Sequence, residues 1–225
     1  MDVGLGLILF VVFLFSTTVH EAMHAWVAYR GGDPTAYHGG QVSLSPIPHI
    51  KREPIGMLVV PLITAVTQGW AMGWASSPYD PYWAARHPRR AALMAAAGPA
   101  GNFAIALVAF SILKVGLISG WFYPSQSLEF ETLAVAASGP NVITTMLSIF
   151  LTLNVLLGVF NLFPLPPLDG AAVVSIFLPS ATRARVSEFM SNGMMSLLGL
   201  LVAWRVFPKI VYPLLSFVRQ LLYAS

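Results

Sequence analysis

Residues 3–29 read VGLGLILFVVFLFSTTVHEAMHAWVAY, and this stretch decides the fold because it is long and apolar enough to cross a bilayer as one helix. It nevertheless contains three ionisable side chains, those of His20, Glu21 and His24. Such groups are costly at membrane depth unless they are paired, bind a metal or face a water-filled cavity. The N-terminus has no basic n-region and no small-residue cleavage site, and the apolar run carries HExxH, so we expect a permanent span rather than a signal peptide.

The spacing HExxH predicts a metal site on this helix. His20 and His24 are four residues apart, which places them on one helix face a turn apart, the spacing that lets two imidazoles hold one zinc ion. Glu21 follows the first histidine and can act on a metal-activated water without ligating the metal. At this point two alternatives stay open: a chance match, or two buried histidines that hydrogen-bond to carbonyl groups.

The composition places the whole chain in a membrane. Of 225 residues, 56% are hydrophobic and 9% are charged, whereas a soluble domain has roughly 25% charged residues. We therefore predict an all-α polytopic membrane protein, a single membrane-embedded domain over residues 1–225 with a catalytic core at 3–178 and a C-terminal helical segment at 193–223. Cysteine is absent, so thiolates cannot bind zinc. The pI near 9.4 is attributed to basic cytoplasmic loops and not to nucleic-acid binding.

Four to six spans are expected. Residues 91–114 and 142–163 are uninterrupted apolar runs that should each form one span. Residues 55–74 should re-enter the membrane or cross it as a pair of broken segments. Residues 193–223 are apolar and are divided by Pro208 and Pro213. The polar segment 37–48, YHGGQVSLSPIP, alternates like a short strand and predicts a small membrane-associated β-hairpin after the first helix.

The distribution of Lys and Arg predicts the orientation. The connections 30–54, 76–90 and 164–192 carry these residues, whereas 115–141 carries none. By the positive-inside rule the first three connections face the cytoplasm, and with them the end of the first helix that carries HExxH. The expected location is the cell membrane, with the active site toward the cytoplasmic side.

A third metal ligand is expected at the same depth, and Asp169 fits this expectation. Prolines at 164, 166 and 167 end the preceding span, and Gly170 allows a sharp turn directly after the aspartate. Two imidazoles and one carboxylate leave the fourth zinc position open for water, as in catalytic sites. Asp169 can also be the N-cap of a helix that begins at Ala171, which does not exclude ligation.

The two motifs together match a family. HEAMH at 20–24, with NLFPLPPLDG at 161–170, resembles the site-2 protease family of intramembrane zinc metalloproteases, which pairs HExxH with NxxPxPxLDG. GGQVSLSPIPHI is similar to the membrane-embedded β-hairpin region of that family, and AAAGPAGNF to its glycine-proline-asparagine span. The resemblance covers about residues 5–170 and implies a minimal core form without a PDZ or CBS domain. It further implies one Zn²⁺ per chain at His20, His24 and Asp169, with Glu21 as the general base.

The resemblance also implies a substrate and a role for Asn161. The substrate would be a spanning segment of another membrane protein, unwound and bound by β-addition to the strand around residues 41–45. Asn161 would lie beside the substrate or its oxyanion, although an interhelical hydrogen bond is an equal alternative. Asn102 is expected to be structural, and His38, His49 and His87 are not expected to be ligands. The oligomeric state is left open.

A different function class remains as the alternative: a non-proteolytic relative that serves as a membrane scaffold or metal transporter. A transporter should carry further His, Asp or Glu along a path across the bilayer, and the other predicted spans have none. A degenerate scaffold would usually have lost Glu21 or a ligand, and all are present.

Overall fold

The computed structural model describes residues 2–127, 129–139, 141–179, 182–183 and 193–224. Within these residues, four helices are long and apolar enough to cross a membrane: α1 (Val3–Arg30), α6 (Pro88–Ile118), α7 (Val142–Asn161) and α10 (Gly193–Tyr223). This makes the chain a multi-pass membrane protein and confirms the predicted helical class. Large aliphatic side chains such as Leu107 and Leu201 lie exposed on the outside of the bundle, as expected for surfaces that face lipid.

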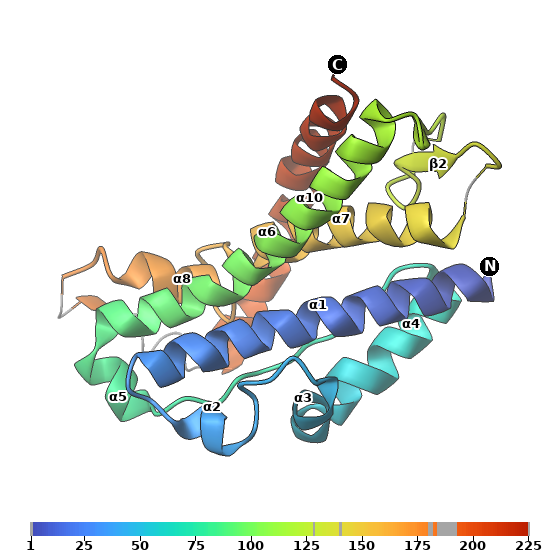
Figure 1. Ribbon diagram of the computed structural model, residues 1–225. Coiled ribbons are helices and arrows are strands. Elements are labelled where there is room, and N and C mark those ends of the chain that lie inside the picture. Colours follow the sequence, from blue (N-terminus) through green and yellow to red (C-terminus); the bar gives the residue numbers. More distant parts are fainter. Residues whose placement is uncertain (1, 128, 140, 180–181, 184–192, 225) are drawn as a thin grey trace.

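Helix α1 is fixed at both ends. The Asp2 carboxylate caps its start by accepting a hydrogen bond from the Gly4 amide at 2.8 Å. At its other end the Gly31 carbonyl accepts hydrogen bonds from the Trp83 indole at 3.1 Å and the Arg90 guanidinium at 3.0 Å. Because Arg90 lies at the beginning of α6, these bonds hold the end of α1 against the start of α6 (Figure 1).

Short helices connect α1 to α6. They are α2 (Thr35–His38), α3 (Pro46–Arg52), η1 (Ile55–Val59), which continues into α4 (Val60–Gln68), and α5 (Pro81–Arg86). The apolar stretch Ile55–Gln68 is too short to span, since a spanning helix needs about 20 residues. After Gln68 the chain returns without regular secondary structure to α5. Residues 55–74 thus form a broken, non-spanning pair of segments.

The predicted β-hairpin at 37–48 is wrong. Residues 42–44 form bends, and Ser45 caps α3 by accepting a hydrogen bond from the Ile47 amide at 3.4 Å, with Pro46 in the first turn. Serine followed by proline is a helix-start signal, and here it outweighs a five-residue alternation. The two-stranded antiparallel sheet instead follows α6, where β1 (Phe122–Pro124) pairs with β2 (Ala134–Ala136). The sheet lies within residues 115–141, which the sequence indicated only as a connection between two spans.

A proline-rich turn brings the chain back after α7. Helix α7 begins with a capping box between Asn141 and Thr144 and ends at Asn161, and α8 (Asp169–Ser175) follows the prolines. Asp169 is the first residue of α8 and not its N-cap, which is Leu168. No Cβ would fit at Gly170, because it would overlap the Leu162 carbonyl, so this return needs glycine.

Helix α10 packs against this turn. Gly199 faces the Pro166 carbonyl so closely that a Cβ would overlap it, and Ala203 packs with Phe163 and Leu168. The expected division at Pro208 and Pro213 is wrong, since α10 runs unbroken over 31 residues. A proline inside a membrane helix is tolerated where neighbouring groups compensate for the lost hydrogen bond. Arg185, part of the predicted basic connection, lies outside the described residues.

Two apolar clusters lie beside a buried polar centre. One joins α6, α7 and α10 and contains Leu113, Leu151 and Leu215; the other joins α1, α4 and α7 around Val12 and Ile149. Next to these clusters, where α1, α6 and α7 lie side by side (Figure 1), a group of polar residues is buried. Its members are Ser16, His20, Glu21, His24, Asn102 and Asn154.

Candidate metal centre

His20, His24 and Asp169 meet in the interior of the bundle. The Nε2 atoms of the two histidines are 2.9 Å apart, and Asp169 Oδ2 lies 3.2 Å from Nε2 of His20 and 3.3 Å from Nε2 of His24. The structure therefore brings together the three residues that the sequence singled out, although α1 and α8 are far apart in the chain. Together they form a possible metal site.

The Nδ1 atom of each imidazole already has a hydrogen-bond partner. Nδ1 of His20 lies 2.6 Å from the Asn102 amide oxygen, and Nδ1 of His24 lies 2.7 Å from the Met94 carbonyl oxygen. Both partners are acceptors only, so each Nδ1 must carry the hydrogen in the neutral ring. Each Nε2 then presents a lone pair toward the centre of the site, which is the form that ligates a metal.

These donor atoms fit a zinc ion. Two lone pairs and a carboxylate oxygen within 3.3 Å of one another repel each other unless a cation lies between them. In a tetrahedral site with Zn–N bonds of about 2.0–2.1 Å, ligand atoms are about 3.3 Å apart, close to the spacing found here. Gly98 of α6 keeps this space free, since a Cβ there would lie 2.6 Å from Nε2 of His20.

Glu21 lies beside the site as an unpaired acid. Its side chain is 5% exposed, and its Oε2 atom is buried without a hydrogen-bond partner among the described residues. A buried carboxylate oxygen without a partner is costly unless it is protonated or accepts a hydrogen bond from a water. Its position directly after His20 on α1 is the one expected of a general base that handles a water proton.

The site is enclosed but not sealed. The Asp169 side chain is 21% exposed, against 10% for His20 and 9% for His24. The most exposed of the three candidate ligands is therefore the one on α8.

The remaining candidate residues are placed as follows. The Asn161 amide donates to the Leu157 carbonyl at 2.9 Å within its own helix, so its proposed role beside the substrate stays a prediction. His49 is buried, and its ring donates to the Ser43 carbonyl at 3.0 Å. Among the described residues, neither His49 nor His38 nor His87 belongs to the possible metal site.

Sequence reasoning expected Gly98 to allow close packing of a neighbouring helix, but it missed that Gly98 faces the candidate ligands and that Asn102 contacts His20. Asn102 was expected to be only structural, but its amide oxygen holds the first histidine. Both residues belong to the run GPAGN at 98–102 in the middle of an apolar helix. The available signal was the asparagine itself, since a polar side chain at that depth needs a partner.

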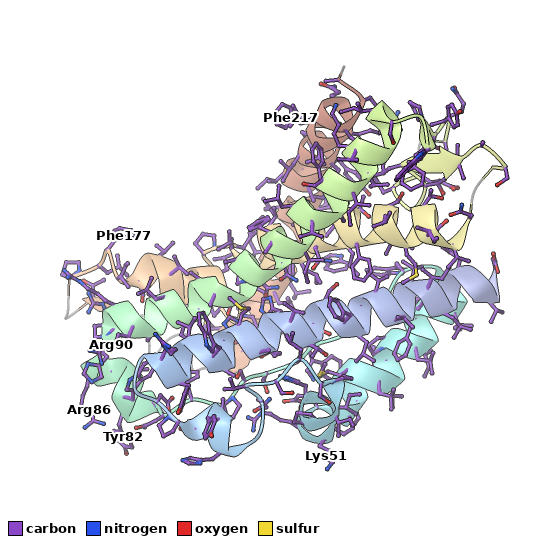
Figure 2. The ribbon with its side chains drawn as sticks, viewed as in Figure 1. Lys51, Tyr82, Arg86, Arg90, Phe177 and Phe217 are labelled. Carbon is purple, nitrogen blue, oxygen red and sulfur yellow. The ribbon has the colours of Figure 1, made fainter. Side chains whose placement is uncertain are left out.

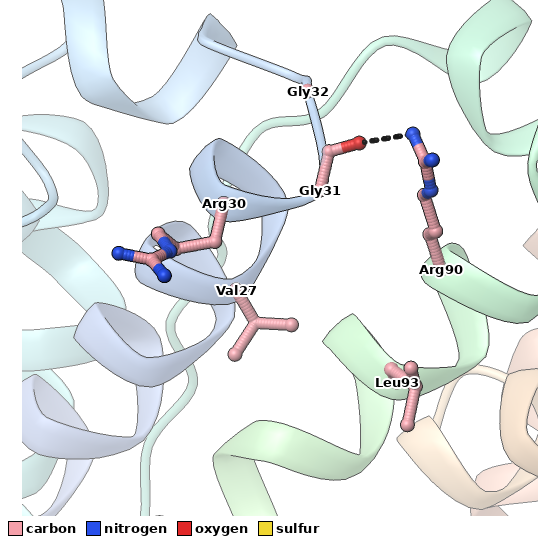
Figure 3. Close-up of a pocket in the computed structure, with 6 residues that line it drawn as sticks. All are labelled: Val27, Arg30, Gly31, Gly32, Arg90 and Leu93. Atoms are coloured by element: carbon pink, nitrogen blue, oxygen red, sulfur yellow. Dashed lines mark hydrogen bonds between the residues drawn. The ribbon is translucent and has the colours of Figure 1, made fainter.

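Two hollows lie away from the metal centre. One of about 410 Å³ lies between the last turn of α1 and the start of α6, and its lining contains no carboxylate or imidazole (Figure 3). The other, of about 420 Å³, is largely apolar and is bounded by α1, residues 69–73, α7 and α10. Neither is lined by His20, His24 or Asp169, so the chemistry belongs to the buried polar centre.

Comparison with known proteins agrees with this geometry. The model of Peptidase family M50 matches residues 8–204. A Bacillus subtilis protein named "Putative zinc metalloprotease YwhC" is 32% identical over 194 residues, covering 86% of this chain and 80% of the relative. Two mycobacterial proteins are named "Putative zinc metalloprotease Rip2". The Mycolicibacterium smegmatis protein is 24% identical, and the match covers 89% of this chain and 68% of the relative. The Mycobacterium tuberculosis protein is 27% identical, and the match covers 84% of this chain and 64% of the relative. No solved structure matches the chain significantly.

Proposed function

This chain belongs to peptidase family M50 and is a zinc metalloprotease, and we propose that it cleaves peptide bonds within or near the spanning segments of other membrane proteins. The observation that carries the proposal is the position of the candidate metal centre. Its candidate ligands lie on α1 and α8 and face Gly98 of α6, and both α1 and α6 are long enough to span, so the centre is not in a soluble domain. A peptide bond that reaches this centre has to enter the bundle.

The residues divide the chemical work among them. His20, His24 and Asp169 would hold one zinc ion, which supplies Lewis-acid polarisation of a carbonyl and activation of water. Glu21 takes the proton of the attacking water and returns it to the leaving amine nitrogen. The neutral Nδ1–H forms of His20 and His24 keep both lone pairs directed inward while this proton moves.

The substrate must arrive with its backbone unwound, since the amides of an intact helix are bonded internally. The apolar hollow beside α1, α7 and α10 offers a surface on which an apolar segment can lie. β-Addition to residues 41–45 is not part of this proposal, because that segment is not a strand.

The distribution of positive charge supports an orientation with the metal centre toward the cytoplasm, in the cell membrane. The connection between α1 and α6 carries Lys51, Arg52 and Arg86, and Figure 2 shows Lys51 and Arg86 at its outer edge. Arg30 comes directly before the connection, and Arg89 and Arg90 lie in the first turn of α6 after it. By the positive-inside rule this connection is cytoplasmic. Transport of a metal is disfavoured, because α6, α7 and α10 contain no His, Asp or Glu that could form a path.

Cleavage of a model substrate tests the proposal. The purified chain in lipid nanodiscs should cut a labelled single-span protein, and a zinc chelator should stop the reaction. Glu21→Gln should bind zinc as the wild type does but lose at least about 10²-fold in rate, as expected when a general base is removed. Cleavage that persists undiminished in Glu21→Gln, or the absence of cleavage with any spanning substrate, would contradict the proposal.

A further inference from the structure

The imidazole of His20 is the last member of a hydrogen-bond chain that runs through α7, α6 and α1. At its far end the Asn154 amide donates to the Phe150 carbonyl at 2.9 Å and to the Ser16 hydroxyl at 2.9 Å. The Asn102 amide then donates to the Asn154 side-chain oxygen at 2.9 Å. The side-chain oxygen of Asn102 faces His20 Nδ1 at 2.6 Å.

The direction of every bond in this chain follows from the Phe150 carbonyl. A carbonyl can only accept, so Asn154 must turn its NH₂ group toward Phe150 and its oxygen toward Asn102. Asn102 must then present its own NH₂ group to that oxygen, which leaves its oxygen for His20. The ring of His20 consequently carries its hydrogen on Nδ1 and a lone pair on Nε2.

Because these groups are buried, no other orientation of the Asn102 and Asn154 amides is favourable. Asn102, Asn154 and Ser16 are all 0% exposed, so bulk water does not replace a broken bond in the chain. Turning either amide over would set two donors or two acceptors against each other in a region of low dielectric. The Ser16 carbonyl, 3.5 Å from the Asn102 NH₂ group, favours the same orientation.

We infer that Asn154 is a positioning residue of the metal centre, which sets the tautomer of His20 through Asn102. Asn154 hydrogen-bonds to none of the three candidate ligands and acts only through this relay. Helix α7 also leads through the proline-rich turn to Asp169. One helix therefore controls two of the three ligands. The inference rests on His20 as a metal ligand and not on the identity of the protein substrate.

Zinc affinity of the full chain, measured by competition with a chelator, tests the inference without any proteolysis. Asn102→Ala should weaken zinc binding about 10- to 100-fold, the usual effect of removing a partner of a ligating histidine. Asn154→Leu, which removes the remote link, should weaken it about 5- to 10-fold. The double variant should bind no more weakly than Asn102→Ala alone, because both substitutions break the same chain.

Two further variants separate positioning from packing. Asn154→Asp should bind zinc within threefold of the wild type, because its carboxyl still accepts from Asn102 in either protonation state. Thr152→Val should leave the affinity unchanged, since this buried hydroxyl on the same helix donates only to the Ser148 and Ile149 carbonyls. Where Asn154→Leu does not give a cooperative melt, the more adaptable Asn154→Met takes its place.

The outcomes distinguish this inference from its premise. If His20→Ala weakens zinc binding but Asn154→Leu and Asn154→Met stay within twofold of the wild type, the relay is overturned. The relay would also be overturned if the losses of zinc affinity from Asn102→Ala and Asn154→Leu added up in the double variant. It would be overturned as well if Thr152→Val weakened zinc binding as much as Asn154→Leu does. If His20→Ala itself leaves zinc binding unchanged, the fault lies with the assignment of His20 as a ligand.

Discussion

Gly98 of α6 lies so close to His20 of α1 that a Cβ at position 98 would lie 2.6 Å from the Nε2 atom of the histidine. The same Cβ would also overlap Nε2 of His24. A glycine in the interior of a helix costs about 0.5–1 kcal/mol relative to alanine. The chain accepts this cost at the one point of α6 where a methyl group would occupy the space between the candidate ligands.

Gly98→Ala should therefore disrupt the metal centre. The added methyl group has to displace one or both imidazoles, so we expect zinc binding to weaken at least about tenfold, with a matching loss of proteolysis. Gly101→Ala is the matched control, because the nearest atoms to its Cβ would be side-chain atoms of Met23, at 2.9 Å, and Val19, at 3.5 Å, and not those of a candidate ligand. Equal zinc affinity in the two variants would show that Gly98 does not keep the space for the metal.

Gly199→Ala in α10 tests whether that helix braces the turn that carries Asp169. Its Cβ would overlap the Pro166 carbonyl, so the turn or the helix must move. We expect a loss of stability of about 1–3 kcal/mol, typical of overpacking, together with weaker zinc binding. Thermal melts with and without zinc measure both effects.

Gly193→Ala provides the control on the same helix, because its Cβ would have no neighbour within 4 Å among the described residues. This variant should melt and bind zinc as the wild type does. If Gly199→Ala behaved like Gly193→Ala, the contact between α10 and the proline-rich turn would have no part in holding Asp169.

Asp33 predicts a pH dependence of stability outside the spans. Burial acts to raise the pKa of Asp33, but hydrogen bonds from the Thr35 hydroxyl, the Asp80 amide and the Thr35 amide outweigh it and lower the pKa below its ordinary value. A lowered folded-state pKa stabilises the fold above the unfolded-state pKa of about 3.9, and this stabilisation is lost as the pH falls through the folded-state value.

Asp33→Asn should accordingly cost about 1.5–3 kcal/mol near neutral pH, the usual worth of a hydrogen bond to a charged group. The difference between the two proteins should shrink as the pH falls below about 4. Melting temperatures from pH 7 to pH 3 in one detergent measure this. A difference that stays constant over that range would show that the charge of Asp33 contributes nothing.

The three residues of the possible metal site could be identified from the sequence because their signals are local. HExxH fixes two imidazoles on one face of any helix, and the prolines before Asp169 return the chain at the end of a span. The β-hairpin at 37–48 was predicted wrongly because alternation over five residues carries little information beside the helix start at Ser45. The sheet after α6 left no sequence signal, since its strands are three residues long.

The contacts between helices could not be foreseen. The bond from Asn102 to His20 depends on the rotation of α6 about its axis, and Asn154 reaches Asn102 only when α7 has the matching rotation. The sequence shows that such polar residues need partners in a membrane but does not say which. The proline positions in α10 were misleading for a related reason, because neighbouring packing decides whether a proline breaks a helix.

The zinc content of the Asp169→Ala variant tests the central claim most directly. By elemental analysis, the purified wild-type chain and Glu21→Gln should each hold one zinc per chain, whereas Asp169→Ala should lose most of it after dialysis against a weak chelator. An Asp169→Ala protein that folds and keeps one zinc per chain would contradict the account.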